Sequence, residues 1–269
     1  MAFIDCHFFS EALRLSCSMH VILPQAASSK QVGIGGAPRR ARCATLYLLH
    51  GLSDDHTIWS RRTAIERHVA GLPLAVVMPA VARSYYQDMA SGPRYWTFVS
   101  EELPRLARSF FPLSGAREDT FAAGLSMGGY GAFRLALAHP RRFAAAASLS
   151  GALDAAAVPA HMDPKDADAV REWQSVFRPR FRIAGSDADL FHLARRAAAS
   201  RGPKPKLFQY CGTGDFLYQD NLRFRDHAAR LGLDLVYRED AGAHTWDRWD
   251  EWIRAVIEWL PLRGRPRRK

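Results

Sequence analysis

Short apolar runs alternate with amphipathic stretches along most of this chain. Apolar residues dominate several of these runs, which predicts strands buried on both faces. The runs cover residues 44–49, 74–78, 119–123, 143–148, 206–211 and 233–238. Other stretches repeat apolar positions at helical spacing and predict helices at residues 63–70, 96–111, 219–231 and 245–260. Strands that alternate with helices favour an α/β fold with a mostly parallel sheet covered on both faces.

Three stretches depart from this alternation. Residues 3–9 and 13–23 read as two strands joined by a turn at Ser10-Glu11-Ala12, which predicts an antiparallel pair near a sheet edge. Residues 25–42 are rich in Ser, Gly, Pro and Arg and are typical of a flexible loop. Within the 96–111 helix, Pro104 predicts a kink or break, because proline lacks an N–H group.

Residues 153–205 also break the pattern, with many Ala, Asp, Arg and Pro and no clear strand. This stretch is too short and interrupted for a domain of its own, and it predicts an inserted helical cap. We therefore expect residues 1–269 to form a single α/β domain, with a cap-like insertion at about 153–205 and a basic tail at 262–269.

Composition supports a large core and limits the partners. The chain is 48% hydrophobic and 24% charged, which is ordinary for a globular protein. It contains no apolar run long enough to span a bilayer, and the first 20 residues lack the basic-then-apolar order of a secretory signal. We therefore expect a cytoplasmic protein that does not enter membranes. The four cysteines show no Cys-x-x-Cys spacing, so the sequence predicts no metal site and no cofactor.

The net charge of +10 raises the question of nucleic-acid binding. Of the 37 basic residues, 32 are arginine, which indicates a general preference for arginine over lysine. The densest basic runs lie in the 25–42 loop and at the C-terminus, where such runs are usually solvated. The sequence therefore predicts no specific nucleic-acid partner, and it leaves open whether identical chains associate.

The candidate chemistry centres on Gly124-Leu125-Ser126-Met127-Gly128. This Gly-x-Ser-x-Gly motif lies between a predicted strand and an alanine-rich helical stretch, the setting in which the motif exposes a nucleophilic serine. The motif alone is weak, because a glycine-rich turn with an ordinary surface serine has the same sequence. A serine nucleophile also needs a histidine base and a carboxylate that orients the base.

Suitable partners follow Ser126 in chain order. Asp215 comes after the 206–211 strand, and His244 comes after the 233–238 strand, both where open α/β sheets place functional groups. Asp215 could instead cap the next helix, and Asp220 is the alternative acid, although its position favours a capping role. For the oxyanion, we expect the N–H groups of Met127 and Leu52 to act as donors. The neighbouring His50 is expected to be buried and structural.

Four motifs together resemble the esterase D family, and the chain is most similar to its bacterial tributyrin-type carboxylesterases. The motifs are Leu49-His50-Gly51-Leu52, Gly124-Leu125-Ser126-Met127-Gly128-Gly129-Tyr130-Gly131, the segment 211–221, and His244-Thr245-Trp246-x-x-Trp249. The resemblance implies an α/β-hydrolase fold, a Ser126–Asp215–His244 triad and short-chain acyl esters as small-molecule substrates. It departs at residues 153–205 and at Gly214, where an acidic residue is more usual.

The leading hypothesis is therefore a metal-independent serine carboxylesterase for acetyl to butyryl esters, including acetylated sugars. Large side chains at Leu52, Met127, Tyr130 and Trp246 are expected to wall a small acyl pocket. S-formylglutathione hydrolase is the alternative, although Ser53-Asp54 replaces the threonine-cysteine pair typical of that branch. A non-catalytic binding protein would usually lack a triad member. A mycolyl-type acyltransferase would carry an export leader.

Overall fold

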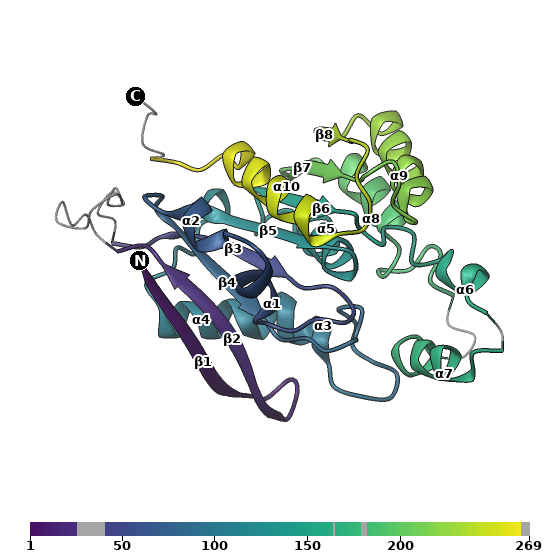
Figure 1. The fold of residues 1–269 in the computed structure, drawn as a ribbon, viewed down its shortest axis with the longest axis horizontal. Helices are drawn as coiled ribbons and strands as arrows, with labels where there is room; N and C mark the ends of the chain where they lie inside the picture. The colour runs from purple at the N-terminus through teal and green to yellow at the C-terminus, as the bar shows by residue number, and fades with distance from the viewer. Residues whose placement is uncertain (26–40, 164, 179–181, 265–269) are drawn as a thin grey trace.

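The computed structural model describes residues 1–25, 41–163, 165–178 and 182–264. The flexible loop expected at 25–42 and the basic tail expected at 262–269 lie largely outside the described residues. Figure 1 shows a twisted sheet with helices around it.

Eight strands form one sheet in the order β1-β2-β4-β3-β5-β6-β7-β8. The strands are β1 (Ala2–Ser10), β2 (Leu15–Leu23), β3 (Ala44–Leu49), β4 (Leu74–Pro79), β5 (Thr120–Leu125), β6 (Ala145–Leu149), β7 (Lys206–Tyr210) and β8 (Leu235–Arg238). The β1–β2 and β2–β4 pairs are antiparallel, and all other neighbouring pairs are parallel. The mostly parallel sheet and the antiparallel pair at its edge are therefore confirmed.

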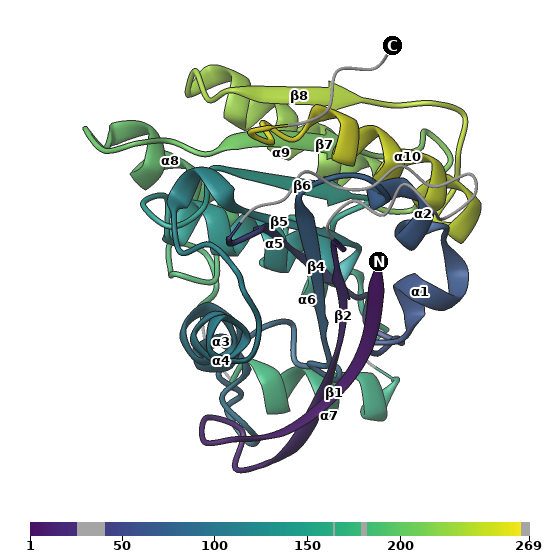
Figure 2. The same cartoon turned by 90° about the vertical axis from the view of Figure 1, so that its left-hand side faces the viewer.

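Helices cover both faces of the sheet. The helices of the described residues are α1 (Ile58–Arg62), α2 (Ile65–Val69), α3 (Tyr95–Thr97), α4 (Leu103–Phe110), α5 (Met127–Ala138), α6 (Val158–His161), α7 (Ala167–Val176), α8 (Leu190–Ala199), α9 (Tyr218–Arg230) and α10 (Trp246–Trp259). In Figure 2, α1, α2 and α10 lie on the right of the sheet, and α3, α4 and α8 lie on the left. No helix in the described residues is long and apolar enough to cross a bilayer.

The side chains of β3 point alternately to the two faces of the sheet, so this strand contributes to two hydrophobic cores. Tyr47 and Leu49 belong to the core beneath α4, α5, α8 and α9, whereas Leu46 and Leu48 belong to the core beneath α1, α2 and α10. All four side chains are almost fully buried. A strand covered on both faces must be apolar at every position, which is the pattern that identified it in the sequence.

The helix expected at 96–111 continues through Pro104 instead of breaking there. It runs from α3 through a π-helical turn, Phe98–Glu102, into α4. Pro104 has no N–H to donate to the Ser100 carbonyl, which lies one helical turn earlier. The guanidinium of Arg142 donates to that carbonyl instead. The wider turn and this outside donor explain why the helix does not end at the proline.

The described part of residues 153–205 contributes three helices with different surroundings. Helix α8 packs against α5 and α9 as part of the helical layer. Figure 1 shows α6 and α7 at the right, beyond the sheet. The Trp173 ring on α7 meets the Tyr85 ring edge-on, with centroids 5.1 Å apart. The division of the chain into one domain with a cap-like insertion stays a prediction.

Candidate active site

Ser126 occupies the sharp turn between β5 and α5. Its φ of 51° and ψ of −118° are strained for a residue with a side chain. The turn requires glycine on either side: a Cβ on Gly124 would lie 2.3 Å from the Gly128 carbonyl oxygen, and one on Gly128 would lie 2.4 Å from the Leu49 oxygen. The missing side chains let α5 approach β3 and β5 closely, and Ser126 then lines a cavity above the sheet.

Two glycine-containing loops bring Asp215 and His244 together. The Gly214 N–H donates to the Gly242 carbonyl at 2.9 Å. A Cβ on Gly212 would lie only 2.2 Å from the same carbonyl oxygen, so this contact depends on the absence of a side chain. The loop after β7 and the loop before α10 therefore touch through their backbones, and the Asp215 and His244 side chains meet beside that contact.

Asp215 binds His244 and also holds its own turn. One carboxylate oxygen accepts from His244 Nδ1 at 2.8 Å, and the other accepts from the Leu217 N–H at 2.9 Å. Burial raises the pKa of Asp215, but the hydrogen bonds from His244 and Leu217 together with the His244 charge outweigh burial, and the net pKa lies below its ordinary value. The ionised carboxylate fixes the proton of His244 on Nδ1 and leaves Nε2 free as a base.

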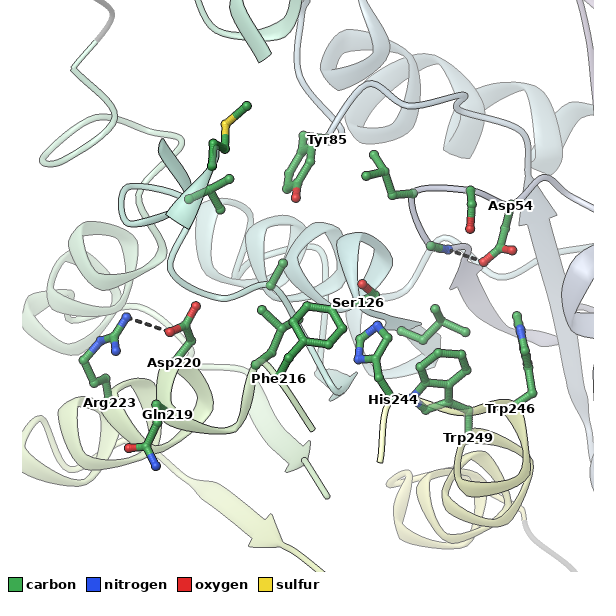
Figure 3. A pocket seen from close by; sticks show the side chains of 18 residues that line it. Asp54, Tyr85, Ser126, Phe216, Gln219, Asp220, Arg223, His244, Trp246 and Trp249 are labelled. Carbon is green, nitrogen blue, oxygen red and sulfur yellow. Dashed lines mark hydrogen bonds and ion pairs between the residues drawn. The ribbon is translucent and has the colours of Figure 1, made fainter. Parts of the chain in front are cut away.

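Aromatic rings hold the His244 imidazole in place. The Trp249 ring meets it edge-on with centroids 4.8 Å apart, and Phe216 lies against it at 4.5 Å. Trp249 is itself fixed, because its indole N–H donates to Ser150 Oγ at 3.1 Å. Figure 3 shows the imidazole pointing toward Ser126, and both residues line the same cavity. The arrangement can transfer a proton between a serine hydroxyl and an imidazole.

His50 organises the loop after β3, as expected for a buried structural residue. Its Nδ1 bonds the Gly51 carbonyl at 2.7 Å, and its Nε2 accepts from the Val81 N–H at 3.0 Å. The Gly51 N–H donates to Asp54 Oδ2 at 3.2 Å. His50 Nε2 can accept this bond from Val81 only when the imidazole is neutral, and burial lowers the pKa of His50 to about 4.

The expected oxyanion donors lie at the ends of two neighbouring strands. Leu52 lines the cavity, and Met127 is the first residue of α5, directly after Ser126. Among the described residues, neither backbone N–H has a hydrogen-bond acceptor. The Met127 side chain is buried in the core, so it does not form the cavity wall expected from the sequence. Two free N–H groups, one of them at the N-terminus of α5, are suited to bind a negative oxygen.

The cavity encloses about 870 Å³, a volume typical of small-molecule sites. Trp246 lines it as expected, but the assignment of Tyr130 to the pocket is wrong. Tyr130 is fully buried, its hydroxyl donates to the Ala188 carbonyl at 2.7 Å, and it accepts from Gln87 Nε2 at 2.7 Å. One turn into α5, the helix has rotated this side chain into the core beneath α8.

Sequence reasoning missed several side chains of the cavity wall. They are Asp54, Tyr85, Val158, Met162, Phe216, Gln219 and Arg223. Phe216, directly after Asp215, is 77% exposed at the mouth, an unusual position for a large apolar ring. Asp220 also lines the cavity from the first turn of α9, and its Oδ1 accepts from Arg223 at 2.8 Å.

The described residues contain one group of side chains with the spacing of metal ligands, Asp5, His20 and His56. None of the three lines the cavity.

A strained serine on a strand-to-helix turn, in a cavity at the carboxyl ends of a mostly parallel sheet, defines a serine hydrolase with the α/β-hydrolase fold. Comparison with known families then places the chain within that class. A family model described as "Putative esterase" matches residues 12–259, and the chain belongs to this esterase family.

Individual relatives agree with this assignment. The chain is 33% identical to an acetyl esterase of Caldicellulosiruptor saccharolyticus over 265 residues, which cover 97% of this chain and 98% of the relative. It is 34% identical to FphF, a fluorophosphonate-binding serine hydrolase of Staphylococcus aureus, with a TM-score of 0.85 over 97% of this chain and 98% of the other. The S-formylglutathione hydrolase FrmB of the same organism gives 34% identity, the same coverage and a TM-score of 0.82.

The buried neutral state of His50 predicts a pH-dependent stability. The unfolded histidine binds its proton near pH 6.5, whereas the folded one does so near pH 4. The contribution of His50 to the free energy of unfolding is therefore complete above pH 6.5. It falls by about 3 kcal/mol as the pH drops toward 4. We expect His50→Gln to lose this part of the pH dependence, because the amide oxygen can still accept from Val81 but does not titrate.

Urea unfolding of both proteins at several pH values measures the effect. Between pH 6.5 and 4, the wild-type free energy of unfolding should fall more steeply with pH than that of His50→Gln. The difference in slope should correspond to the uptake of nearly one proton on unfolding. Other buried histidines contribute equally to both curves. Parallel curves would show that His50 is not held neutral.

Proposed function

We propose that the chain is a serine carboxylesterase that hydrolyses short-chain acyl esters, acetyl to butyryl, and that it belongs to the esterase D branch. Ser126 is the nucleophile, His244 the general base and Asp215 the residue that orients His244. The observation that carries the proposal is the 2.8 Å hydrogen bond between the buried Asp215 and His244, which lines the same cavity as Ser126. The reaction uses no cofactor.

The reaction proceeds through an acyl-enzyme. His244 Nε2 takes the Ser126 proton as Oγ attacks the ester carbonyl carbon, and the carbonyl oxygen becomes an oxyanion. The Leu52 and Met127 N–H groups bind that oxygen, aided by the partial positive charge at the start of α5. The C–O bond to the alcohol then breaks, and His244 gives its proton to the departing oxygen. Water, activated by the same imidazole, releases the acid and restores Ser126.

A rigid tryptophan cluster supports the preference for a short acyl group. Trp246 meets Trp59 and Trp249 edge-on, with centroids 5.4 Å and 5.0 Å away. Trp59 is fully buried, so the cluster cannot yield easily to a longer chain. In Figure 3, Trp246 and Asp54 lie on one side of Ser126, and Phe216 and Arg223 lie on the other. We assign the acyl group to the Trp246 side and the alcohol to the wider Phe216 side.

S-formylglutathione hydrolase is the second candidate function. The FrmB relative carries that name at 34% identity, and polar groups at the alcohol side could meet the charged parts of a glutathione leaving group. Gln219 and Arg223 supply such groups. The carboxylesterase proposal is preferred because Arg223 is already paired with two carboxylates, Asp154 and Asp220, at 3.0 Å and 2.8 Å. Within this proposal, the cytoplasm is the expected location.

The first test of the function is Ser126→Ala. Loss of the attacking oxygen should lower turnover of p-nitrophenyl acetate by at least about 10³-fold, because base and carboxylate have no nucleophile to activate. A fluorophosphonate probe should label the wild type once, at Ser126 by peptide mass spectrometry, and leave the variant unlabelled. Near-normal turnover by a folded Ser126→Ala protein would rule out the proposed nucleophile. S-formylglutathione in the same assay separates the two candidate functions.

The second test concerns acyl length. For the wild type, kcat/KM should peak between acetyl and butyryl and fall by octanoyl, because each methylene gains about 0.8 kcal/mol only while it finds apolar space. Trp246→Ala should move the peak toward longer chains. Phe216→Ala is the matched control, since it removes a ring from the alcohol side and should leave the acyl profile unchanged. A wild-type profile that still rises at octanoyl would contradict an enclosed acyl pocket.

A further inference from the structure

A second cluster of reactive side chains lies outside the cavity, on the β1–β2 hairpin. Asp5 and His20 are cross-strand partners in the antiparallel register, so their side chains lie on the same face. His56 reaches them from the segment between β3 and α1, the segment that also carries Leu52 and Asp54. The cluster thus joins the edge of the sheet to the loop that borders the candidate active site.

The donor atoms are spaced as metal ligands. Asp5 Oδ1 lies 3.7 Å from His20 Nε2 and 3.9 Å from His56 Nε2, and the ligand atoms of all three residues lie within 4.8 Å of one another. Ligands at tetrahedral zinc bonded at about 2.0–2.1 Å are separated by roughly 3.3–3.5 Å. Asp5, with half of its side chain exposed, needs to move only a few tenths of an ångström toward each histidine nitrogen. The remaining separation, between the two imidazole nitrogens, is at most 4.8 Å, and rotation of the rings would shorten it.

The hydrogen bonds around His20 leave a lone pair on its Nε2 that faces the Asp5 carboxylate. The Ser60 hydroxyl donates to Met78 Sδ at 3.9 Å, so its oxygen is free to accept from His20 Nδ1, which lies 3.4 Å away. With the proton on Nδ1, Nε2 presents a lone pair toward the Asp5 carboxylate. Metal-binding histidines are oriented in this way by a hydrogen bond to their other ring nitrogen. Two facing acceptors repel unless a cation lies between them.

His56 gives an independent indication. Its Nδ1 is buried and has no hydrogen-bond partner in the described part of the chain, and its Nε2 approaches Asp5 Oδ1 only at 3.9 Å. The ring meets that of His20 edge-on, with centroids 4.8 Å apart. A metal ion bound to Nε2, between His56 and Asp5, would give the ring a partner that the described protein groups do not supply.

We propose that Asp5, His20 and His56 form a binding site for one divalent transition-metal ion, with zinc as the ion that best suits two imidazoles and a carboxylate. His7, whose Nε2 lies 3.3 Å from the other Asp5 oxygen, stands beside the site and can supply a fourth ligand in place of water. The ion would bind the β1–β2 hairpin to the segment that carries Leu52. Its role is structural, because none of its ligands lines the cavity.

Zinc binding is measured directly on the full chain by isothermal titration calorimetry at pH 7.5, after removal of metal with a chelator. We expect one high-affinity ion per chain, with a Kd of micromolar or below. Cobalt(II) in place of zinc should give the visible absorption of a tetrahedral or five-coordinate site. His56→Gln and Asp5→Asn should each weaken binding at least tenfold and remove the absorption.

His192→Gln is the matched control, because it removes a histidine on α8, far along the chain from the cluster, and should leave binding unchanged. The melting temperature should rise with zinc in the wild type and not in His56→Gln. Binding weaker than about 100 µM, or binding that survives both cluster substitutions, would overturn the proposal. These readouts do not depend on ester hydrolysis, so the metal site and the proposed function can fail separately.

Discussion

The close approach of α5 to β3 and β5 is the constraint on which the site depends. Gly124 and Gly128 leave no room for a single carbon atom at their contacts, with separations of 2.3 Å and 2.4 Å to neighbouring carbonyl oxygens. That packing forces Ser126 into a strained conformation, which the many buried contacts of α5 maintain. The hydroxyl is thereby held above the sheet, and the Met127 N–H at the start of α5 has no acceptor among the described residues.

The rest of the site is built by holding loops against this fixed turn. His50 and Asp54 bind the backbone of the loop that carries Leu52, and the backbone contact between Gly212 and Gly242 joins the loops of Asp215 and His244. The parallel strand order brings all of these loops to one edge of the sheet. The proposed metal site would add a further restraint on the Leu52 segment from its outer side. A catalytic geometry of this kind needs little rearrangement when substrate binds.

The sequence was most informative where one local rule decides the structure. Doubly buried strands must be apolar, and the serine turn requires glycine, so the sheet and the Ser126 turn could be predicted. The direction of individual side chains was harder to predict. Tyr130 shares the glycine-rich motif with Ser126, yet the rotation of the helix places its side chain in the core. The cavity wall from residues 153–205 and the Asp5–His20–His56 cluster depend on tertiary contacts and strand register, which no motif records. Arg142 likewise supports the Pro104 turn from a distant segment.

The most direct measurement of the central claim compares two carboxylates that lie five residues apart. Asp215→Asn keeps the shape of the side chain but favours the wrong histidine tautomer, and it should lower kcat by on the order of 10⁴-fold. Asp220→Asn weakens the pair with Arg223 but leaves the Asp215–His244 hydrogen bond in place, and it should keep kcat within tenfold. Circular dichroism spectra of both variants should match the wild type, which separates loss of activity from loss of fold. A nearly inactive Asp220→Asn together with an active Asp215→Asn would contradict the account.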